Sequence, residues 1–150
     1  MILVTVGTQF FDGLIDEVDR LVAAGVLTDH VWAQIGLAGK TPQHIEHVAF
    51  DRGLIDKARK ADLIITHAGT GSLCEFIVLD RPMIAVANQT KAGNHQLEFL
   101  EQLSAVYDFC WVASPGELEA ALPLARRPRP LGTSTLDSLA EDIRMALVST

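Results

Sequence analysis

The chain has 150 residues, of which 49% are hydrophobic and 21% charged, and its formal net charge at pH 7 is −7. This length and hydrophobic content are enough for a sizeable core, which argues against a disordered chain and predicts one domain spanning residues 1–150. The acidic balance, without clusters of Lys and Arg, argues against nucleic acid as a partner.

Strand and helix patterns alternate along the chain. The β-branched run at 2–6 predicts a strand buried on both faces. Apolar residues from Leu14 to Val22 recur every three or four positions, which predicts an amphipathic helix with Asp12 as its N-cap. In chain order we then expect strands 30–36 and 44–50, helix 54–61, strand 62–66, helix 72–80, strand 82–87, helix 94–103, strand 105–112 and helix 115–122. This order predicts a doubly wound parallel α/β sheet with helices on both faces.

The segment 124–132, LARRPRPLG, interrupts this alternation. Its prolines and arginines predict an irregular surface connection, or alternatively a basic contact for a partner or for anionic lipid head groups. Ser134 is then expected to cap a last amphipathic helix at 136–148. The apolar residues of this helix and of 97–103 exceed what one small sheet can cover, so we expect a homo-oligomer or a partner at that surface.

Cysteine usage and hydropathy indicate the compartment. Cys74 and Cys110 lie in apolar surroundings without metal-ligand spacing, so we expect free thiols in a reducing cytoplasm. No apolar run approaches the roughly eighteen residues of a membrane span, and the N-terminus enters a strand without a basic leader. These features predict a soluble, cytoplasmic chain.

Three loops that follow strands are candidates for a binding site, because ligands of open α/β sheets bind beyond the carboxyl ends of the strands. They are residues 7–9, 67–72 and 88–96, and we expect them at one edge of the sheet. Gly69 and Gly71 allow a ligand to approach the backbone closely or allow a positive φ. A helix that starts near Ser72 offers free N–H groups to a diphosphate. The sequence contains neither a GxxxxGK[ST] motif nor a GxGxxG turn after its first strand, which argues against ATP and NAD.

The polar residues of these loops have two interpretations each. Glu75 stands three residues after Ser72, so it either completes a capping box or accepts the two hydroxyls of a ribose. His67 is either a structural histidine or a functional one at a strand end. The polar run 94–96 either begins a helix or contacts a sugar. The remaining histidines, His30, His44 and His47, lie away from this edge, so we expect no metal site.

Three stretches together resemble the donor-binding half of family 28 glycosyltransferases: VTVGTQFFDGLIDEVD, ADLIITHAGTGSLCEFIVLDRPMIAVAN and NHQLEFLEQL. The resemblance covers residues 1 to about 112 and is greatest to the small catalytic subunits of two-component enzymes. It implies a Rossmann-like domain, one half of a GT-B enzyme, that binds a UDP-sugar. It also implies that a separate, membrane-associated protein binds the acceptor.

The resemblance also implies roles for individual residues. The first-strand turn faces the diphosphate and the acceptor, the loop after the strand 62–66 contacts phosphate and sugar, and Phe50 lies near the uracil. Glu75 falls where a glutamate binds the ribose, which favours that role over capping. The polar run 94–96 resembles the segment that recognises the donor sugar in this family. Just before it, KAGN at 91–94 replaces the acidic residue that is usual there. The complete expected site comprises Gly7, Thr8, Gln9, Phe50, His67, Ala68, Gly69, Thr70, Gly71, Ser72, Glu75, Asn94, His95 and Gln96.

The implied reaction is a metal-independent, inverting transfer from a UDP-sugar, such as UDP-N-acetylglucosamine or another UDP-hexose, to a lipid-linked acceptor. Such reactions serve exopolysaccharide or glycolipid biosynthesis at the cytoplasmic face of a membrane, and no cofactor is expected. No general base is evident: His67 is a candidate, and otherwise the acceptor half contributes it. The alternatives are a non-catalytic UDP-sugar-binding regulatory subunit and a UDP-sugar epimerase-like protein, although such epimerases need two Rossmann halves in one chain.

Overall fold

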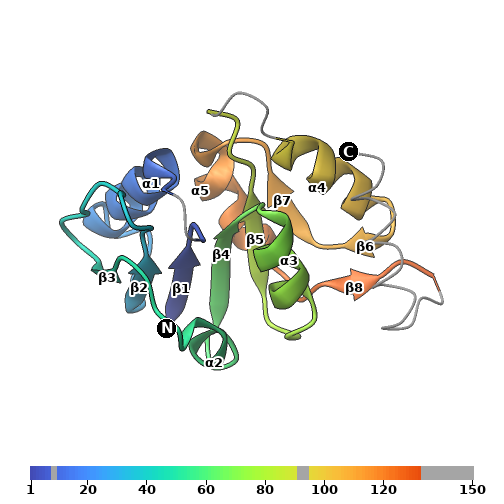
Figure 1. The fold of residues 1–150 in the computed structure, drawn as a ribbon, viewed down its shortest axis with the longest axis horizontal. Coiled ribbons are helices and arrows are strands. Elements are labelled where there is room, and N and C mark those ends of the chain that lie inside the picture. The colour runs from blue at the N-terminus through green and yellow to red at the C-terminus, as the bar shows by residue number, and fades with distance from the viewer. Residues whose placement is uncertain (8–9, 91–94, 133–150) are drawn as a thin grey trace.

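Six parallel strands form the central sheet of the computed structural model, which describes residues 1–7, 10–90 and 95–132 (Figure 1). Their order across the sheet is β3-β2-β1-β4-β5-β7. The strands are β1 Ile2–Thr5, β2 Val31–Gln34, β3 Glu46–Val48, β4 Leu63–His67, β5 Met83–Val86 and β7 Cys110–Val112. Because every pairing is parallel, the carboxyl ends of all six strands meet at one edge.

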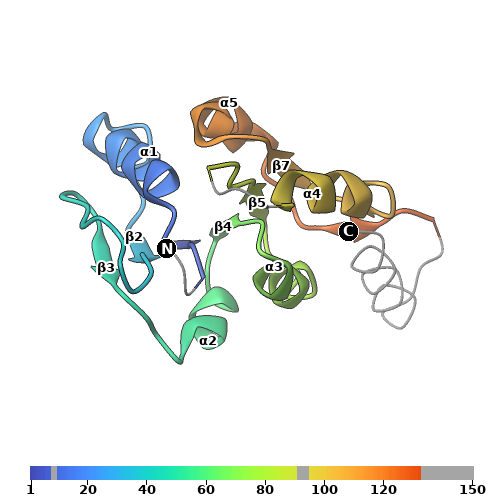
Figure 2. The ribbon, with the colours of Figure 1, turned by 45° about the horizontal axis from the view of Figure 1, so that its top comes forward.

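Helices cover both faces of this sheet, as Figure 2 shows for α1 and α5 on one side and α2 and α3 on the other. The helices are α1 Asp12–Ala23, α2 Leu54–Ala58, α3 Thr70–Ile77, α4 Gln96–Ser104 and α5 Leu118–Ala121, with 3-10 turns η1 Pro115–Glu117 and η2 Leu122–Leu124. Neighbouring residues of a strand point to opposite faces, so Val4 belongs to the core cluster that includes α1, while Leu3 belongs to the one that includes α3 and α4. The predicted doubly wound α/β fold is therefore confirmed.

The predicted strand 105–112 is wrong as a single element. Its first part forms β6, Tyr107–Asp108, which leaves the central sheet and pairs antiparallel with β8, Arg129–Pro130. The second part, β7, pairs with β5. The segment 124–132 therefore contributes a short strand and is not wholly irregular, because a partner strand far away in sequence satisfies its backbone.

The arginines of the segment 124–132 are paired within the chain. Arg126 contacts Asp108 at 2.9 Å, and Arg129 and Arg127 contact Asp80 at 2.6 Å and 3.6 Å. Because these carboxylates offset the basic charge, the structure favours a connection over a lipid-binding patch for this segment.

The apolar side of α4 is covered by the chain itself. Phe99, Leu100 and Leu103 are buried against the sheet, so α4 does not supply the uncovered surface that its sequence suggests. The predicted helix at 136–148 and its cap Ser134 lie outside the described residues. Within the described ranges, no helix combines the length and the apolar character that crossing a membrane requires.

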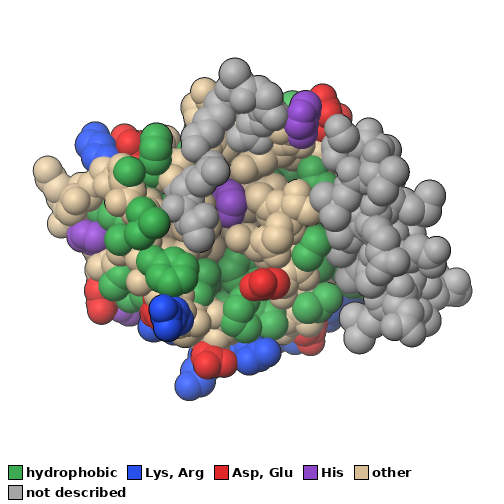
Figure 3. Space-filling model, in the orientation of Figure 1, with side chains coloured by type: hydrophobic (Ala, Val, Ile, Leu, Met, Phe, Trp, Pro, Cys, Tyr) green, Lys and Arg blue, Asp and Glu red, His purple; other side chains and the backbone are tan. Residues whose placement is uncertain are grey.

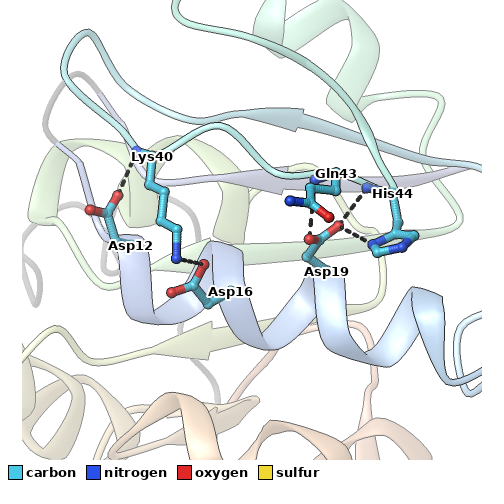
Figure 4. Close-up of polar contacts among 6 residues, drawn as sticks. All are labelled: Asp12, Asp16, Asp19, Lys40, Gln43 and His44. Carbon is cyan, nitrogen blue, oxygen red and sulfur yellow. Dashed lines mark hydrogen bonds and ion pairs between the residues drawn. The ribbon is translucent and has the colours of Figure 1, made fainter.

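Three aspartates on one side of α1 hold the connection between β2 and β3 (Figure 4). Asp12 accepts a hydrogen bond from the Lys40 backbone N–H at 2.8 Å, and Asp16 lies 3.4 Å from the Lys40 ammonium. Asp19 accepts from the backbone N–H groups of Gln43 at 3.1 Å and His44 at 2.7 Å. Asp12 is therefore not the N-cap of α1: the capping position belongs to Phe11, whose side chain accepts no hydrogen bond.

We expect Asp19→Asn to reduce the free energy of unfolding at pH 7 by about 1–2 kcal/mol, because a charged acceptor of two backbone N–H groups is lost. Burial raises the pKa of Asp19, but the hydrogen bonds from Gln43 and His44 and the His44 charge outweigh it, so the pKa lies below its usual value. A lowered pKa means that the carboxylate stabilises the fold above about pH 4 and that this stabilisation is lost as the pH falls further.

Urea unfolding of Asp19→Asn and of the wild type at pH 7 and at about pH 3 measures this difference in the free energy of unfolding, which should be smaller at the second pH than at the first. Asp16→Asn, which removes only an exposed ion pair, is the control and should stay within about 0.5 kcal/mol of the wild type. Equal stability of Asp19→Asn and wild type at pH 7 would contradict the assignment.

Candidate functional site

A cavity of about 450 Å³ opens at the edge of the sheet where the strands end. The residues that line it are Gly7, Gln34, Phe50, Asp51, Arg52, Leu54, Ile55, His67, Gly69, Thr70, Gly71, Ser72 and Glu75. They come from the loops after β1, β3 and β4, from the end of β2 and from the starts of α2 and α3. In Figure 3, hydrophobic side chains gather on the part of this face that lies over β2 and β3.

The cavity brings together eight of the site residues that the sequence predicts, from Gly7, Phe50 and the segment 67–75. The prediction that these loops share one edge holds for the described parts. Ala68 is buried and lies outside the lining. Thr8, Gln9 and Asn94 lie outside the described residues.

The third predicted loop lies against the second through Gln96. Its side-chain oxygen accepts hydrogen bonds from the backbone N–H groups of Ala68 at 3.1 Å and Asn88 at 2.9 Å. Gln96 thus ties the end of β5 to the end of β4 and stands behind the cavity lining. His95 is exposed, lies 3.3 Å from Glu98 and also lies outside the lining.

The ring of His67 occupies the space between two glycines. A Cβ atom at Gly69 would lie 2.2 Å from the ring carbon Cε1, and one at Gly7 would lie 2.7 Å from Nε2. Gly69 has an ordinary φ of −62°, so the chain needs glycine there to accommodate the ring and not to reach a positive φ. At Gly71, by contrast, a Cβ would meet nothing within 4 Å, so that position is open toward the cavity.

His67 is neutral and acts as a hydrogen-bond donor to Ser72. Burial lowers the pKa of His67 to about 4. The Gly69 backbone N–H donates to Nδ1 at 3.2 Å, which places the ring proton on Nε2, 3.3 Å from Ser72 Oγ. Ser72 Oγ therefore accepts from His67, and its own proton is available to a ligand. This arrangement suits His67 to orienting Ser72 and not to accepting a proton at neutral pH.

Helix α3 begins earlier than the sequence suggests, which removes one interpretation of Glu75. The helix starts at Thr70 with Gly69 in the N-cap position, so Ser72 is its third residue. The proposed capping box of Ser72 and Glu75 is therefore wrong. Glu75 is exposed, lines the cavity, and makes no hydrogen bond or ion pair with another described residue.

The first turn of α3 presents backbone donors to the cavity. The first intrahelical bond runs from the Leu73 N–H to the Gly69 carbonyl, so the N–H groups of Thr70, Gly71 and Ser72 precede it. All three residues line the cavity, and no side chain in the described part of the chain caps this turn. Free N–H groups and the positive end of the helix dipole favour an anion at this position.

Five lining residues are absent from the sequence prediction: Gln34, Asp51, Arg52, Leu54 and Ile55. Asp51 forms an ion pair with Lys57, whose hydrogen bond lowers the Asp51 pKa. The segment 51–55 follows a strand end, so the rule that ligands bind beyond the carboxyl ends of strands could have located it, whereas Phe50 was expected only from the resemblance. Gln34 is a polar residue ending an otherwise apolar strand, which is the signal that could have identified it.

The cavity thus combines an anion site at α3, the carboxylate of Glu75, which pairs with no other described residue, and an apolar wall. Phe50, whose side chain is 48% exposed, contributes to this wall with Leu54 and Ile55. Within residues 1–7, 10–90 and 95–132, no group of three His, Cys, Asp or Glu could hold a metal ion. The arrangement suits a ligand with a flat ring, a diol and a phosphate.

Comparison with known proteins identifies relatives of the chain. The model of the glycosyltransferase family 28 C-terminal domain matches residues 1–130. The UDP-N-acetylglucosamine transferase subunit ALG13 of Homo sapiens is 33% identical over 115 residues, which are 68% of this chain and 10% of that protein. A UDP-N-acetylglucosamine--N-acetylmuramyl-(pentapeptide) pyrophosphoryl-undecaprenol N-acetylglucosamine transferase of Phocaeicola vulgatus is 32% identical over 116 residues, which are 74% of this chain and 29% of that protein.

A solved structure supports the doubly wound α/β fold described above. The NMR structure of ALG13 matches with a TM-score of 0.55 at 17% identity, covering 93% of this chain and 92% of that one. The chain spans only about a tenth of the human relative and under a third of the bacterial one. The family match, which covers residues 1–130, nevertheless decides the classification: the chain belongs to the glycosyltransferase family 28 C-terminal domain family.

Proposed function

We propose that the chain binds a UDP-sugar in the cavity at the carboxyl ends of its strands and is the donor-binding part of a glycosyltransferase. The observation that carries this proposal is one cavity lined by the exposed Phe50, by the first-turn amides of α3 and by Glu75, which have no partner among the described residues. Residues 1–150 would then form a single donor-binding domain. The names of the relatives favour UDP-N-acetylglucosamine as the donor.

Each part of the nucleotide has a matching part of the cavity. The diphosphate fits the first turn of α3, where backbone N–H groups and the Ser72 hydroxyl donate. Glu75, the sixth residue of α3, lies in its second turn and accepts both ribose hydroxyls through charge-assisted bonds. The uracil ring packs near Phe50, against the apolar wall. The remaining predicted residues, Thr8, Gln9, Asn94, His95 and Gln96, belong to the sugar and acceptor side of this proposal.

The cavity supports departure of UDP better than it supports activation of the acceptor. Negative charge develops on the diphosphate as the sugar leaves, and the α3 dipole and N–H groups stabilise it, as a metal ion does in other transferases. Asp51 is paired with Lys57, His67 is neutral with Nδ1 occupied, and Glu75 is assigned to the ribose. The general base for an inverting transfer therefore comes with the acceptor, from another polypeptide.

We propose that this other polypeptide is a membrane-associated subunit that binds a lipid-linked acceptor. The human relative is named a transferase subunit, and the name of the bacterial relative includes pyrophosphoryl-undecaprenol, a lipid pyrophosphate. The chain would then act at the cytoplasmic face of a membrane through its partner, in exopolysaccharide or glycolipid biosynthesis. A homo-oligomer in the absence of this partner is part of the same proposal.

Titration with UDP tests the nucleotide assignment. At a UDP concentration 100 times the dissociation constant, binding stabilises the folded state by about 2.7 kcal/mol, which raises Tm by roughly 5–10 °C. We expect this rise with UDP and UDP-N-acetylglucosamine, and a smaller one with GDP, dTDP and ADP. A preference for the adenine nucleotide would refute the proposal.

Turnover assays separate the transferase from its alternatives. We expect the isolated chain to bind UDP but to transfer little or no sugar, because the described lining offers no further base once Glu75 holds the ribose. Transfer should appear when the partner subunit and a lipid-linked acceptor are added. Robust transfer by the chain alone would contradict the two-subunit proposal, and no transfer in the reconstituted pair would favour a regulatory subunit.

A further inference from the structure

We propose that Gln34 is a positioning residue that holds the two ends of the nucleotide site at the correct separation. This inference rests on the proposed function, because it assigns the cavity to a nucleotide. Gln34 is the last residue of β2, which lies between β1 and β3 in the sheet. Its side chain is therefore placed to reach the loops that follow both neighbours.

The Gln34 amide makes one hydrogen bond to each of these loops. Its Nε2 donates to the Gly7 carbonyl oxygen at 2.9 Å, and its Oε1 accepts from the Asp51 backbone N–H at 2.9 Å. Gln34 is only 2% exposed, while Gly7 and Asp51 are half-buried, so both bonds are partly shielded from water. Breaking either bond would leave a poorly hydrated backbone group without a partner. One amide that donates on one side and accepts on the other thus links both loops.

The two linked loops serve different parts of the cavity. Gly7 lies against the ring of His67, which orients Ser72 at the diphosphate end. Asp51 follows Phe50 at the uracil end, where its carboxylate accepts from the Gly53 N–H at 2.7 Å and pairs with Lys57. Through its hydrogen bonds to Gly7 and Asp51, Gln34 links the diphosphate end of the cavity to the uracil end. A ligand that spans both ends depends on their separation, because small displacements of binding groups cost affinity.

Gln34→Glu tests this role because the two side chains are nearly isosteric. An ionised glutamate accepts from the Asp51 N–H but places a second oxygen against the Gly7 carbonyl, where a donor is needed. A protonated glutamate donates to Gly7 and restores both bonds. Burial at this position raises a glutamate pKa, so the change of state falls in an accessible pH range.

Among the described residues, charged and titratable groups approach this cavity from the loop after β3, from α2, from β4 and, with Glu75, from α3. Asp51 and Arg52 lie in the loop after β3, and Lys57 lies on α2 with its ammonium 4.6 Å from the Trp32 ring centre. Hydrogen bonding by Lys57 lowers the Asp51 pKa, and His67 on β4 has a pKa of about 4. Neither of the last two groups titrates near neutral pH, so a pH effect specific to the variant reports on residue 34.

The experiment measures the dissociation constant of UDP for wild type, Gln34→Glu and Gln89→Glu between about pH 5.5 and pH 8, a range that covers the raised pKa of a buried glutamate. We expect Gln34→Glu to bind UDP roughly 10-fold to 100-fold more weakly than the wild type at the upper pH, because a buried bond to the Gly7 loop is replaced by repulsion. The ratio of the two constants should shrink to a few-fold at the lower pH, roughly as expected for restored bonding. Dividing the dissociation constant of the variant by that of the wild type at the same pH cancels the effect of UDP ionisation, which is common to both proteins.

Gln89→Glu is the matched control. Gln89 also donates its Nε2 to a backbone carbonyl, that of Ala113 at 2.6 Å, but it is exposed and outside the cavity lining. Its ratio to the wild type should stay within about twofold across the pH range, as for other exposed substitutions. Melting temperatures without ligand are recorded in parallel. A Gln34→Glu variant whose Tm depends on pH while its UDP affinity matches the wild type has lost only a structural bond, which overturns the proposal.

Hydrogen exchange of the Asp51 amide keeps the inference testable if Gln34→Glu does not fold. In the wild type this N–H should exchange more slowly than that of exposed Arg52. Exchange of the Asp51 amide as fast as that of Arg52 would overturn the role of Gln34 without any ligand. Failure of wild type to bind UDP would refute the nucleotide assignment instead, so the two failures are distinguishable.

Discussion

Replacing Glu75 with alanine is expected to weaken UDP binding by about 2–4 kcal/mol, which is roughly 30-fold to 1000-fold, because two charge-assisted bonds to the ribose are lost. The same change should leave the free energy of unfolding within about 0.5 kcal/mol of the wild type, since Glu75 is exposed and caps no helix. Isothermal titration with UDP and urea unfolding measure the two quantities separately.

Two comparisons make the Glu75 result specific to the ribose. Glu75→Gln should lie between wild type and alanine variant, because the amide keeps one acceptor oxygen but points an NH₂ group at hydroxyls that already donate. The 2′-deoxy nucleotide should bind the wild type more weakly than UDP, while the alanine variant should hardly distinguish the two. Glu101→Ala, an exposed glutamate of α4 outside the cavity lining, is the matched control. UDP affinity within twofold of the wild type for Glu75→Ala would show that the ribose lies elsewhere.

Gly69→Ala is expected to destabilise the protein by about 1–3 kcal/mol, which lowers Tm by roughly 3–10 °C, because the new methyl group overlaps the His67 ring. The ring then moves away from Ser72, so UDP binding should weaken as well. Thermal unfolding and UDP titration of the same preparation measure both effects.

Gly71→Ala provides the contrast, because a Cβ atom at Gly69 would overlap the His67 ring whereas one at Gly71 would not contact another residue. A Cβ at Gly71 meets open space, and alanine is the better residue inside a helix by about 0.5–1 kcal/mol, so Tm should stay constant or rise slightly. UDP binding should nevertheless weaken, because the methyl group stands before the free amides of α3. Loss of stability in Gly71→Ala, or none in Gly69→Ala, would contradict the assigned roles.

The order of elements and the edge that carries the site could be predicted from local patterns. The largely apolar runs ILVTV at 2–6 and DLIIT at 62–66 cover β1 and most of β4, because a strand buried on both faces needs mostly apolar residues. Once these strands are parallel neighbours, Gly7 and the segment 67–72 must meet at their carboxyl ends. The sequence therefore determined the fold class and most of the cavity lining that comes from β1, β4 and α3.

The features that the local patterns did not predict depend on contacts between residues far apart in sequence. The start of α3 at Thr70 and the His67 ring between Gly7 and Gly69 follow from packing across two strands. The split of 105–112 required β8, which lies some twenty residues later and offers its backbone to β6.

Gln34 is the clearest case of what only the tertiary structure decided. Its sequence position marks it as a polar residue at the end of a strand, but neither of its partners is near it in the chain: Gly7 precedes it and Asp51 follows it. A buried amide must find both a donor and an acceptor, and which groups these are depends on the order of strands in the sheet. The local sequence sets the pattern of elements, whereas the pairing of buried polar groups is set only when the strands come together.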